Sequence, residues 1–186
     1  MLNDYYKNMD IVFQKFLSDK ENLNNITKAI DFLKETKETN SKIYLIGNGG
    51  SASVAEHIAI DLTKNAGLKA MGVSGSPMLT TFANDYGYEN IFKKFIEIFG
   101  EKDDVLIAIS SSGASKNILN ACDEANLKGM KIITLSGFLP DNPLRTKGDI
   151  NFWIDSKAFG FLEILHGLIL HWINDSIIGK EEYYIK

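Results

Sequence analysis

Two loops rich in glycine and serine hold the residues of this sequence that are best suited to bind an anion. The first is Gly47-Asn48-Gly49-Gly50-Ser51, and the second is Ser110-Ser111-Ser112-Gly113-Ala114-Ser115. Glycines let the backbone approach an anion closely, and exposed N–H groups and hydroxyls can then hydrogen-bond to it. The two loops therefore predict a phosphate cradle built from neutral donors.

Each loop alone also fits a simpler interpretation, a tight turn whose serines cap a helix. Neither loop contains lysine or arginine, which favours a monophosphate over a tightly held triphosphate. Neither has the lysine spacing of a Walker A loop or the Gly-x-Gly-x-x-Gly pattern, so we expect no nucleotide cofactor. Two such loops at equivalent positions of one sheet favour phosphate binding over turns alone.

The elements that position these loops are short apolar runs typical of buried parallel strands. The first loop follows the first strand, and the second loop follows the third. Ligands of an open parallel sheet bind beyond the carboxyl ends of its strands, so both loops should meet at that edge. The predicted strands are Lys42–Ile46, Ala70–Val73, Val105–Ile109, Ile132–Leu135 and Ile150–Ile154.

Apolar residues at three- and four-residue spacing predict helices around these strands. Two of them, about Asp4–Asp19 and a helix with its stripe from Leu23 to Leu33, precede the first strand, and we expect them to pack against a neighbouring subunit. The others are Ser53–Thr63, Pro77–Asn84, Asn90–Phe99, Ser115–Lys128 with Gly129 as its cap, and Phe159–Ile178. The fold class is therefore α/β, a five-stranded mostly parallel sheet flanked by helices, with two extra N-terminal helices.

Composition narrows the class of protein. The chain has 186 residues, which suits a single domain over residues 1–186, and 45% of them are apolar. A formal net charge of -4 gives no general positive field, so we expect no nucleic-acid partner. No apolar run approaches the ~20 residues of a membrane helix, so no membrane partner is expected either. The lone Cys122 and the polar start Met1-Leu2-Asn3-Asp4 predict a cytoplasmic protein.

Both loops, together with Phe82-Ala83-Asn84-Asp85-Tyr86-Gly87, resemble the SIS (sugar isomerase) domain family. The resemblance spans nearly the whole chain, and within the family it is nearest to the phosphoheptose isomerase branch. It implies a homotetramer with active sites built from neighbouring subunits. It also implies conversion of sedoheptulose 7-phosphate to D-glycero-D-manno-heptose 7-phosphate for surface polysaccharides, either lipopolysaccharide or capsule.

The residues expected to bind the sugar phosphate belong to the two loops, with two more that match family positions lining the sugar pocket. They are Asn48, Gly49, Gly50, Ser51, Asn84, Asp85, Ser110, Ser111, Ser112 and Ser115. Asn84 and Asp85 fit equally well a helix C-terminal turn that precedes Gly87.

Aldose–ketose isomerisation moves a proton between adjacent carbons through an enediol, so it needs a base and an acid or a metal. His57 and Asp61 share a helix face because they are four residues apart, and Glu163 and His171 lie on the last predicted helix. By resemblance, the two histidines match metal-site and catalytic positions. Asp61 takes the place of a glutamate base, and Glu163 takes the place of a glutamine.

Imidazole and carboxylate ligands suit zinc, and the predicted ligand set is His57, Asp61, Glu163 and His171. If Asp61 binds the metal, Glu163 is the better base. Without a metal, Asp61 or Glu163 removes the proton and His171 protonates the enediol oxygen. The third histidine, His166, lies in an apolar helix segment and is expected to be an interior or interface residue.

Two segments differ from the usual pattern of the branch. The approach to the last helix, Ala158–Ile164, lacks the charged residues that usually precede the glutamine position. Asn65 stands near the position where some members have an arginine that helps hold the substrate. A noncatalytic SIS protein that binds a replication initiator, or a sensor of a sugar phosphate, is the alternative. The histidine and carboxylate positions favour the enzyme, and the lack of a basic helix-turn-helix disfavours the sensor.

Overall fold

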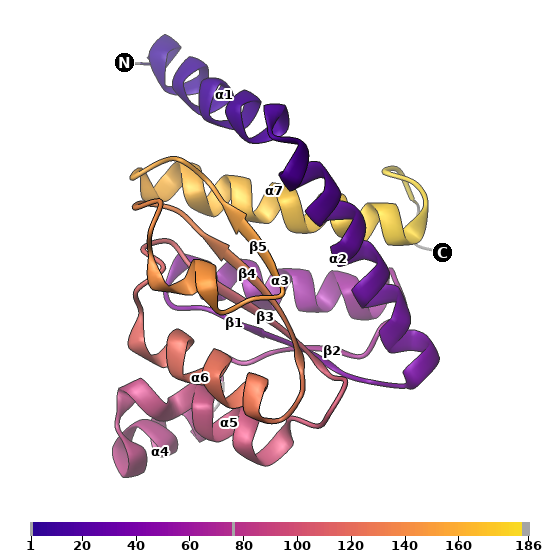
Figure 1. Cartoon of the computed structure of the whole chain (residues 1–186), viewed down its shortest axis with the longest axis vertical. Coiled ribbons are helices and arrows are strands. Elements are labelled where there is room, and N and C mark those ends of the chain that lie inside the picture. The colour runs from indigo at the N-terminus through magenta and orange to yellow at the C-terminus, as the bar shows by residue number, and fades with distance from the viewer. Residues whose placement is uncertain (1, 76, 184–186) are drawn as a thin grey trace.

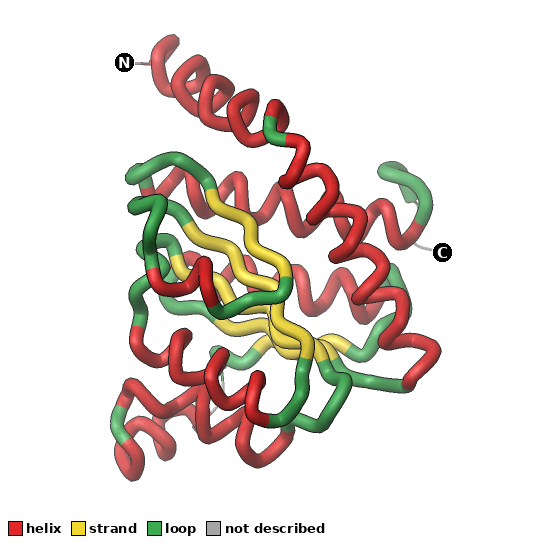
Figure 2. The backbone as a smooth tube through the Cα atoms, in the orientation of Figure 1, coloured by secondary structure: helices red, strands yellow, loops and turns green. Residues whose placement is uncertain are grey.

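A five-stranded sheet with helices on both faces forms the centre of the protein (Figures 1 and 2). The computed structural model describes residues 2–75 and 77–183. Its strands are β1 (Ile43–Ile46), β2 (Ala70–Gly72), β3 (Val105–Ser110), β4 (Lys131–Ser136) and β5 (Ile150–Trp153). All four strand pairs between these segments are parallel. The predicted α/β class is confirmed, and this sheet is parallel throughout.

The order of the strands is β2-β1-β3-β4-β5. β1 therefore lies between β2 and β3, with Ile43 opposite Ala70 on one side and Val105 on the other. The chain thus adds β2 on one side of β1, and then crosses over and adds β3, β4 and β5 on the other side. At such a switch point the loops after the two central strands diverge and leave a crevice. The two predicted phosphate loops follow β1 and β3 and so border this crevice.

Helices cover the sheet in two layers (Figure 1). On one face lie α2 (Lys20–Thr39), α3 (Gly50–Lys64) and α7 (Phe159–Ile178). On the other lie α4 (Pro77–Tyr86), α5 (Ile91–Phe99) and α6 (Lys116–Leu127). The short turns η1 (Tyr88–Asn90) and η2 (Pro143–Thr146) connect elements at the rim. No helix among the described residues is long and apolar enough to cross a membrane.

The alternation of side chains along each strand produces two cores, one on each face. Ile43 and Leu45 of β1 pack among residues of α2, α3 and α7. Tyr44 and Ile46 point the other way and pack among residues of α5 and α6. Burial on both faces explains why the strands are continuous apolar runs in the sequence.

The two leading helices meet at Asp19, which ends α1 (Leu2–Ser18) and caps α2. The Asp19 carboxylate accepts a hydrogen bond from the Glu21 N–H at 2.9 Å. α1 extends away from the sheet at the top of Figure 1, and its Tyr6 and Ile11 side chains are 67% and 65% exposed. The two predicted helices are confirmed, and their contact with a neighbouring subunit stays a prediction.

Two helix boundaries differ from the predicted ones near the loops. α3 begins at Gly50 instead of Ser53, because the N–H groups of Ala52 and Ser53 already donate to the Gly49 carbonyl. α4 continues beyond Asn84 to Tyr86, where Gly87 ends it with a φ of +82°. The N-terminus of α3 therefore lies inside the first glycine loop.

His166 is an interior residue, as predicted, with no exposed surface. Its Nε2–H donates to the carbonyl of Ser136 at the end of β4, 3.2 Å away, while its Nδ1 has no partner among the described residues. Burial lowers the pKa of His166 from 6.5 to about 4, against a smaller opposing effect of the Ser136 hydrogen bond. The imidazole is therefore neutral in the folded protein at pH 7.

This buried imidazole should make the protein less stable in mild acid. Between pH 6.5 and about 4 the unfolded chain takes up a proton that the folded chain does not, so stability falls as the pH falls. The loss should approach about 3 kcal/mol and then level off. Urea unfolding at several pH values should give a smaller loss for His166→Gln, whose amide can still donate to Ser136. Equal losses in both proteins would contradict the assignment.

Candidate active site

A cavity of about 330 Å³ lies between the two loops at the crevice of the sheet. It is lined by Asn48, Gly49, Gly50, Ser51, Ile109, Ser110, Ser111, Ser112, Ser115, Phe159 and Glu163. We call it the serine pocket. Every loop residue predicted to bind the substrate lines it, and α7 contributes Phe159 and Glu163. Among the described residues that line it there is no lysine or arginine.

The first loop turns sharply because its glycines allow close backbone contacts. A side chain at Gly47 would overlap the backbone of Ser51, and Gly49 has a φ of +55°. Within the described chain, no group accepts a hydrogen bond from the N–H of Gly49 or Gly50. These two donors, together with the N-terminal end of α3, are therefore available to an anion in the pocket.

The second loop is held by a buried residue that the sequence analysis did not identify, Asn142. A side chain at Gly113, whose φ is +64°, would overlap the Asn142 side chain. The Asn142 amide donates to the carbonyls of Gly137 and Leu139, at 3.1 and 2.8 Å. Asn142 is thus held by the segment after β4 and packs against Gly113 of the loop, where a larger residue would not fit.

Several hydroxyls of the pocket are free to donate. Ser110 donates to Ser115 across the second loop at 3.1 Å, which leaves the Ser115 proton available. In the described structure, no side chain or backbone group is hydrogen-bonded to the hydroxyls of Ser51 and Ser111. With the free N–H groups, these hydroxyls suit the three oxygens of a phosphate monoester.

A pair of side-chain amides joins the first loop to α6, the helix that follows the second loop. Asn48 and Asn117 each donate to the other's side-chain carbonyl at 2.9 Å, and the Tyr88 hydroxyl also donates to Asn48 at 2.9 Å. Asn117 lies in the first turn of α6, directly after the second loop, and is only 2% exposed. The Asn48 side chain, predicted to bind substrate, is therefore largely engaged in holding the first loop against α6.

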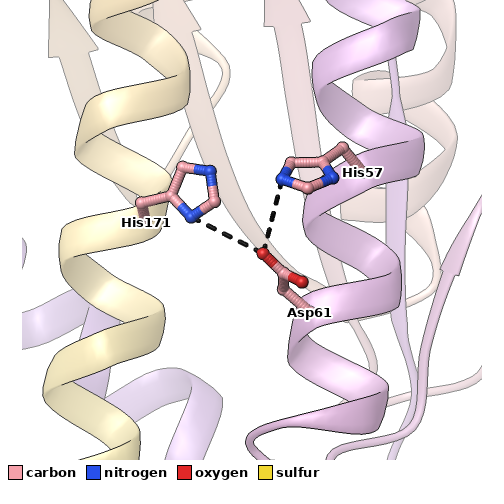
Figure 3. Close-up of side chains that lie close together, drawn as sticks. All are labelled: His57, Asp61 and His171. Atoms are coloured by element: carbon pink, nitrogen blue, oxygen red, sulfur yellow. Dashed lines mark ion pairs between the residues drawn. The ribbon is translucent and has the colours of Figure 1, made fainter. Parts of the chain in front are cut away.

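A cluster of titratable side chains lies between α3 and α7 (Figure 3). Asp61 Oδ2 is 3.5 Å from Nε2 of His57 and 3.6 Å from Nδ1 of His171. The His57 and His171 rings are 5.1 Å apart between centroids. The Asp61 side chain is 15% exposed, whereas the two imidazoles are 59% and 40% exposed. The carboxylate is therefore shielded beneath two accessible imidazoles.

The donor set of this cluster fits a zinc ion. One ligand atom from each of the three residues can be chosen so that all lie within 4.8 Å of one another. Ligands at zinc–nitrogen and zinc–oxygen distances in a tetrahedron are about 3.4 Å apart, close to the two separations measured from Asp61. Three of the four predicted ligands are thus brought together. The fourth, Glu163, lies outside the cluster.

Asp61 is oriented by a neighbour on its own helix. The Asn65 amide donates to Asp61 Oδ1 at 3.2 Å, which turns Oδ2 toward the histidines. The same amide nitrogen is 3.2 Å from the Tyr183 hydroxyl near the end of the described chain. The sequence drew attention to Asn65 only through the arginine of other family members. Its hydrogen bond to Asp61 is seen in the structure alone.

Glu163 connects the two halves of the site. It lines the serine pocket and also a second cavity of about 370 Å³, which lies between α3 and α7 and includes His57 and His171. We call this second cavity the histidine groove. Its remaining lining is apolar, from Val54, Ile58, Ile164 and Leu168, with Gly167.

Asn84 and Asp85 do not line the serine pocket or the histidine groove of their own chain. Both are exposed, and the Asn84 amide donates to the Asp85 carboxylate at 2.8 Å. They lie in the last turn of α4 before Gly87, whose N–H donates to the Ala83 carbonyl at 3.1 Å. Their placement matches the helix-end interpretation that the sequence left open.

The chain is similar to several known proteins. The family model of the SIS domain matches residues 4–137. The phosphoheptose isomerase of Helicobacter pylori strain P12 is 36% identical over 182 residues, covering 90% of this chain and 94% of the relative. That of Photorhabdus laumondii is 43% identical over 175 residues, covering 90% and 89%. The solved phosphoheptose isomerase of Francisella tularensis superposes with a TM-score of 0.87 at 28% identity, covering 96% and 97% of the two chains.

The amide pair should be needed for phosphate binding. In Asn117→Ala, the Asn48 side chain loses two hydrogen bonds, so the first loop should move and the affinity for methyl phosphate should fall about fivefold, equivalent to ~1 kcal/mol. Titration followed by phosphorus NMR measures this. Asn126→Ala, an exposed change on the same helix, is the control. Wild-type affinity in a folded Asn117→Ala protein would show that the pair does not support the pocket.

Proposed function

The chain belongs to the SIS domain family, and we propose that it is a phosphoheptose isomerase that converts sedoheptulose 7-phosphate into D-glycero-D-manno-heptose 7-phosphate. It is an aldose–ketose isomerase that acts on a phosphorylated sugar. The product supplies heptose for lipopolysaccharide or capsule synthesis. Residues 1–186 act as one SIS domain in this proposal.

One observation carries the proposal: an anion cradle and a cavity that contains two histidines are both lined by the same carboxylate, that of Glu163. The serine pocket offers neutral donors for the phosphate, and the histidine groove offers two imidazoles and one carboxylate for proton transfer. Glu163 lines both. A sugar held by its terminal phosphate can therefore extend its carbonyl end along Glu163 toward the histidines.

The reaction requires a base at C1 and an acid at the C2 oxygen. The base removes a proton from C1 of the ketose, the C2 carbonyl oxygen takes up a proton, and an enediol forms. The C1 hydroxyl then loses its proton, and the base returns a proton to C2. Two protons are removed and two are added, so all atoms are conserved and the product is the aldose.

We assign Glu163 as the base and, when no metal is bound, His171 as the acid at the enediol oxygen. Glu163 is partly buried, and its carboxylate makes no hydrogen bond or ion pair within the described chain, so both of its oxygens are available. His171 lines the groove and its side chain is 40% exposed. Asp61 contacts both imidazoles, and without a metal either Asp61 or Glu163 is the base.

Zinc is the proposed cofactor, held by His57, Asp61 and His171, and the geometry of their ligand atoms supports it. When bound, it would polarise the carbonyl and lower the barrier to proton removal. Asp61 would then be a ligand of the metal, which leaves Glu163 as the free base. Asn65 keeps the Asp61 oxygens in the orientation that this assignment needs.

A homotetramer is the proposed assembly, with active sites completed by neighbouring subunits. The histidine groove is open at its outer side, where Ile164 and Leu168 are 50% and 41% exposed. α1 also presents exposed apolar side chains away from its own sheet. These faces are suited to contacts between copies of the chain.

Isomerisation can be tested directly by proton NMR in deuterated water, with sedoheptulose 7-phosphate as the substrate. We expect an aldose phosphate with deuterium at C2, because the base exchanges its proton with solvent. Chelator treatment should lower the rate and added zinc should restore it. Binding of the sugar without exchange or product, in a folded protein, would instead favour a noncatalytic SIS protein.

His171→Ala should lower kcat/KM about 10²–10⁴-fold, because the zinc site loses a ligand, or the metal-free site loses the acid at the enediol oxygen. Steady-state kinetics measures the effect, and circular dichroism checks the fold. Ser176→Ala, on the same helix, is a matched control that should retain activity. Unchanged kcat/KM in His171→Ala would remove this residue from the mechanism.

A further inference from the structure

Glu163 places an unbalanced negative charge where the substrate's phosphate must bind. Its carboxylate lies against Gly50, and a methyl group at Gly50 would overlap it. Gly50 is the first residue of α3, so the carboxylate lies beside the positive end of that helix. No lysine or arginine lines the pocket to offset its charge among the described residues. Phosphate and Glu163 therefore compete for the same end of α3.

The carboxylate has room for a second position. Glu163 also lines the histidine groove, where Gly167 lies four residues further along the same face of α7. Nothing lies within 4 Å of the point where a Gly167 side chain would begin. No hydrogen bond or ion pair to another described residue holds the carboxylate against Gly50. Rotation about its own side-chain bonds can thus carry it from one cavity to the other.

A cation in the groove and an anion in the pocket would both favour this second position. A divalent ion at His57, Asp61 and His171 attracts the carboxylate toward the groove. A phosphate at the N-terminus of α3 repels it from the pocket. Each ligand therefore favours the arrangement that the other binds better, which is a thermodynamic coupling between the two sites.

We propose that Glu163 is a two-position carboxylate that couples phosphate binding in the serine pocket to divalent-metal binding in the histidine groove. The coupling rests on the proposed function, because it presupposes both ligands. The coupling also determines when the base reaches its position. Glu163 enters the groove, beside the sugar's reactive carbons, once the phosphate has bound at the N-terminus of α3. Phosphate binding thereby positions the base.

The metal-free protein gives the first test. Glu163→Gln keeps the shape of the side chain and removes its charge, so methyl phosphate should bind about tenfold more tightly than to the wild type. Phosphorus NMR titration of chelator-treated protein measures this. Glu38→Gln, an exposed carboxylate at the far end of α2, makes the same change in net charge and should leave the affinity unchanged. Equal tightening in both variants, or none in Glu163→Gln, overturns the proposal.

The zinc-loaded protein gives the second test. Zinc should strengthen methyl phosphate binding about tenfold more in the wild type than in Glu163→Gln, because only the charged side chain must leave the pocket. The same factor should appear when zinc affinity is measured by chelator competition with and without methyl phosphate. An equal zinc effect in both proteins overturns the coupling.

Gly50→Ala tests the movement without phosphate. The added methyl group occupies the carboxylate's position at α3 and should drive Glu163 into the groove, so zinc affinity should rise about threefold. Unchanged or weaker zinc binding in the folded variant counts against the two positions. The isomerase assay separates the hypotheses: turnover without coupling removes only this inference, and coupling without turnover removes only the proposed reaction.

Discussion

The parallel pairing of β1 with β3 is the constraint on which the site depends. These strands are distant in the sequence, yet the register Ile43 to Val105 brings their carboxyl ends to the same edge of the sheet. Because β2 lies on the other side of β1, the connections after β1 and β3 leave in opposite directions and open a crevice between them. A slip in this register would separate the two loops, and no side chain could then rebuild the pocket.

Helix packing supplies the second half of the site on the same face of the sheet. α3 begins within the first loop, so a single helix carries the anion-binding N-terminus and, two and three turns later, His57 and Asp61. α7 packs beside α3 and brings Glu163 and His171 across from them. Anion binding and proton transfer are therefore linked through two helices, and through Glu163 in particular.

The sequence predicted most of this architecture because the signals are local. Apolar runs that end at Gly47 and Ser110 indicated strands followed by binding loops, and the spacing of His57 and Asp61 indicated a shared helix face. The contacts that fix the loops were not predictable in the same way. Asn48 pairs with Asn117 and Gly113 packs on Asn142 across long stretches of chain, and a single sequence has no pattern for such contacts. The position of Glu163 against Gly50 likewise depends on how α7 packs on α3.

The amide pair between Asn48 and Asn117 also bears on how the protein matures. Its partners are 69 residues apart, so it can form only after the central strands have found each other. The phosphate pocket is therefore absent from any partly folded chain in which β3 has not yet paired. A sugar phosphate binds only the completed fold, so it raises the free energy of unfolding by an amount that grows with the ligand concentration. A bound sugar phosphate should therefore also protect the protein against proteolysis.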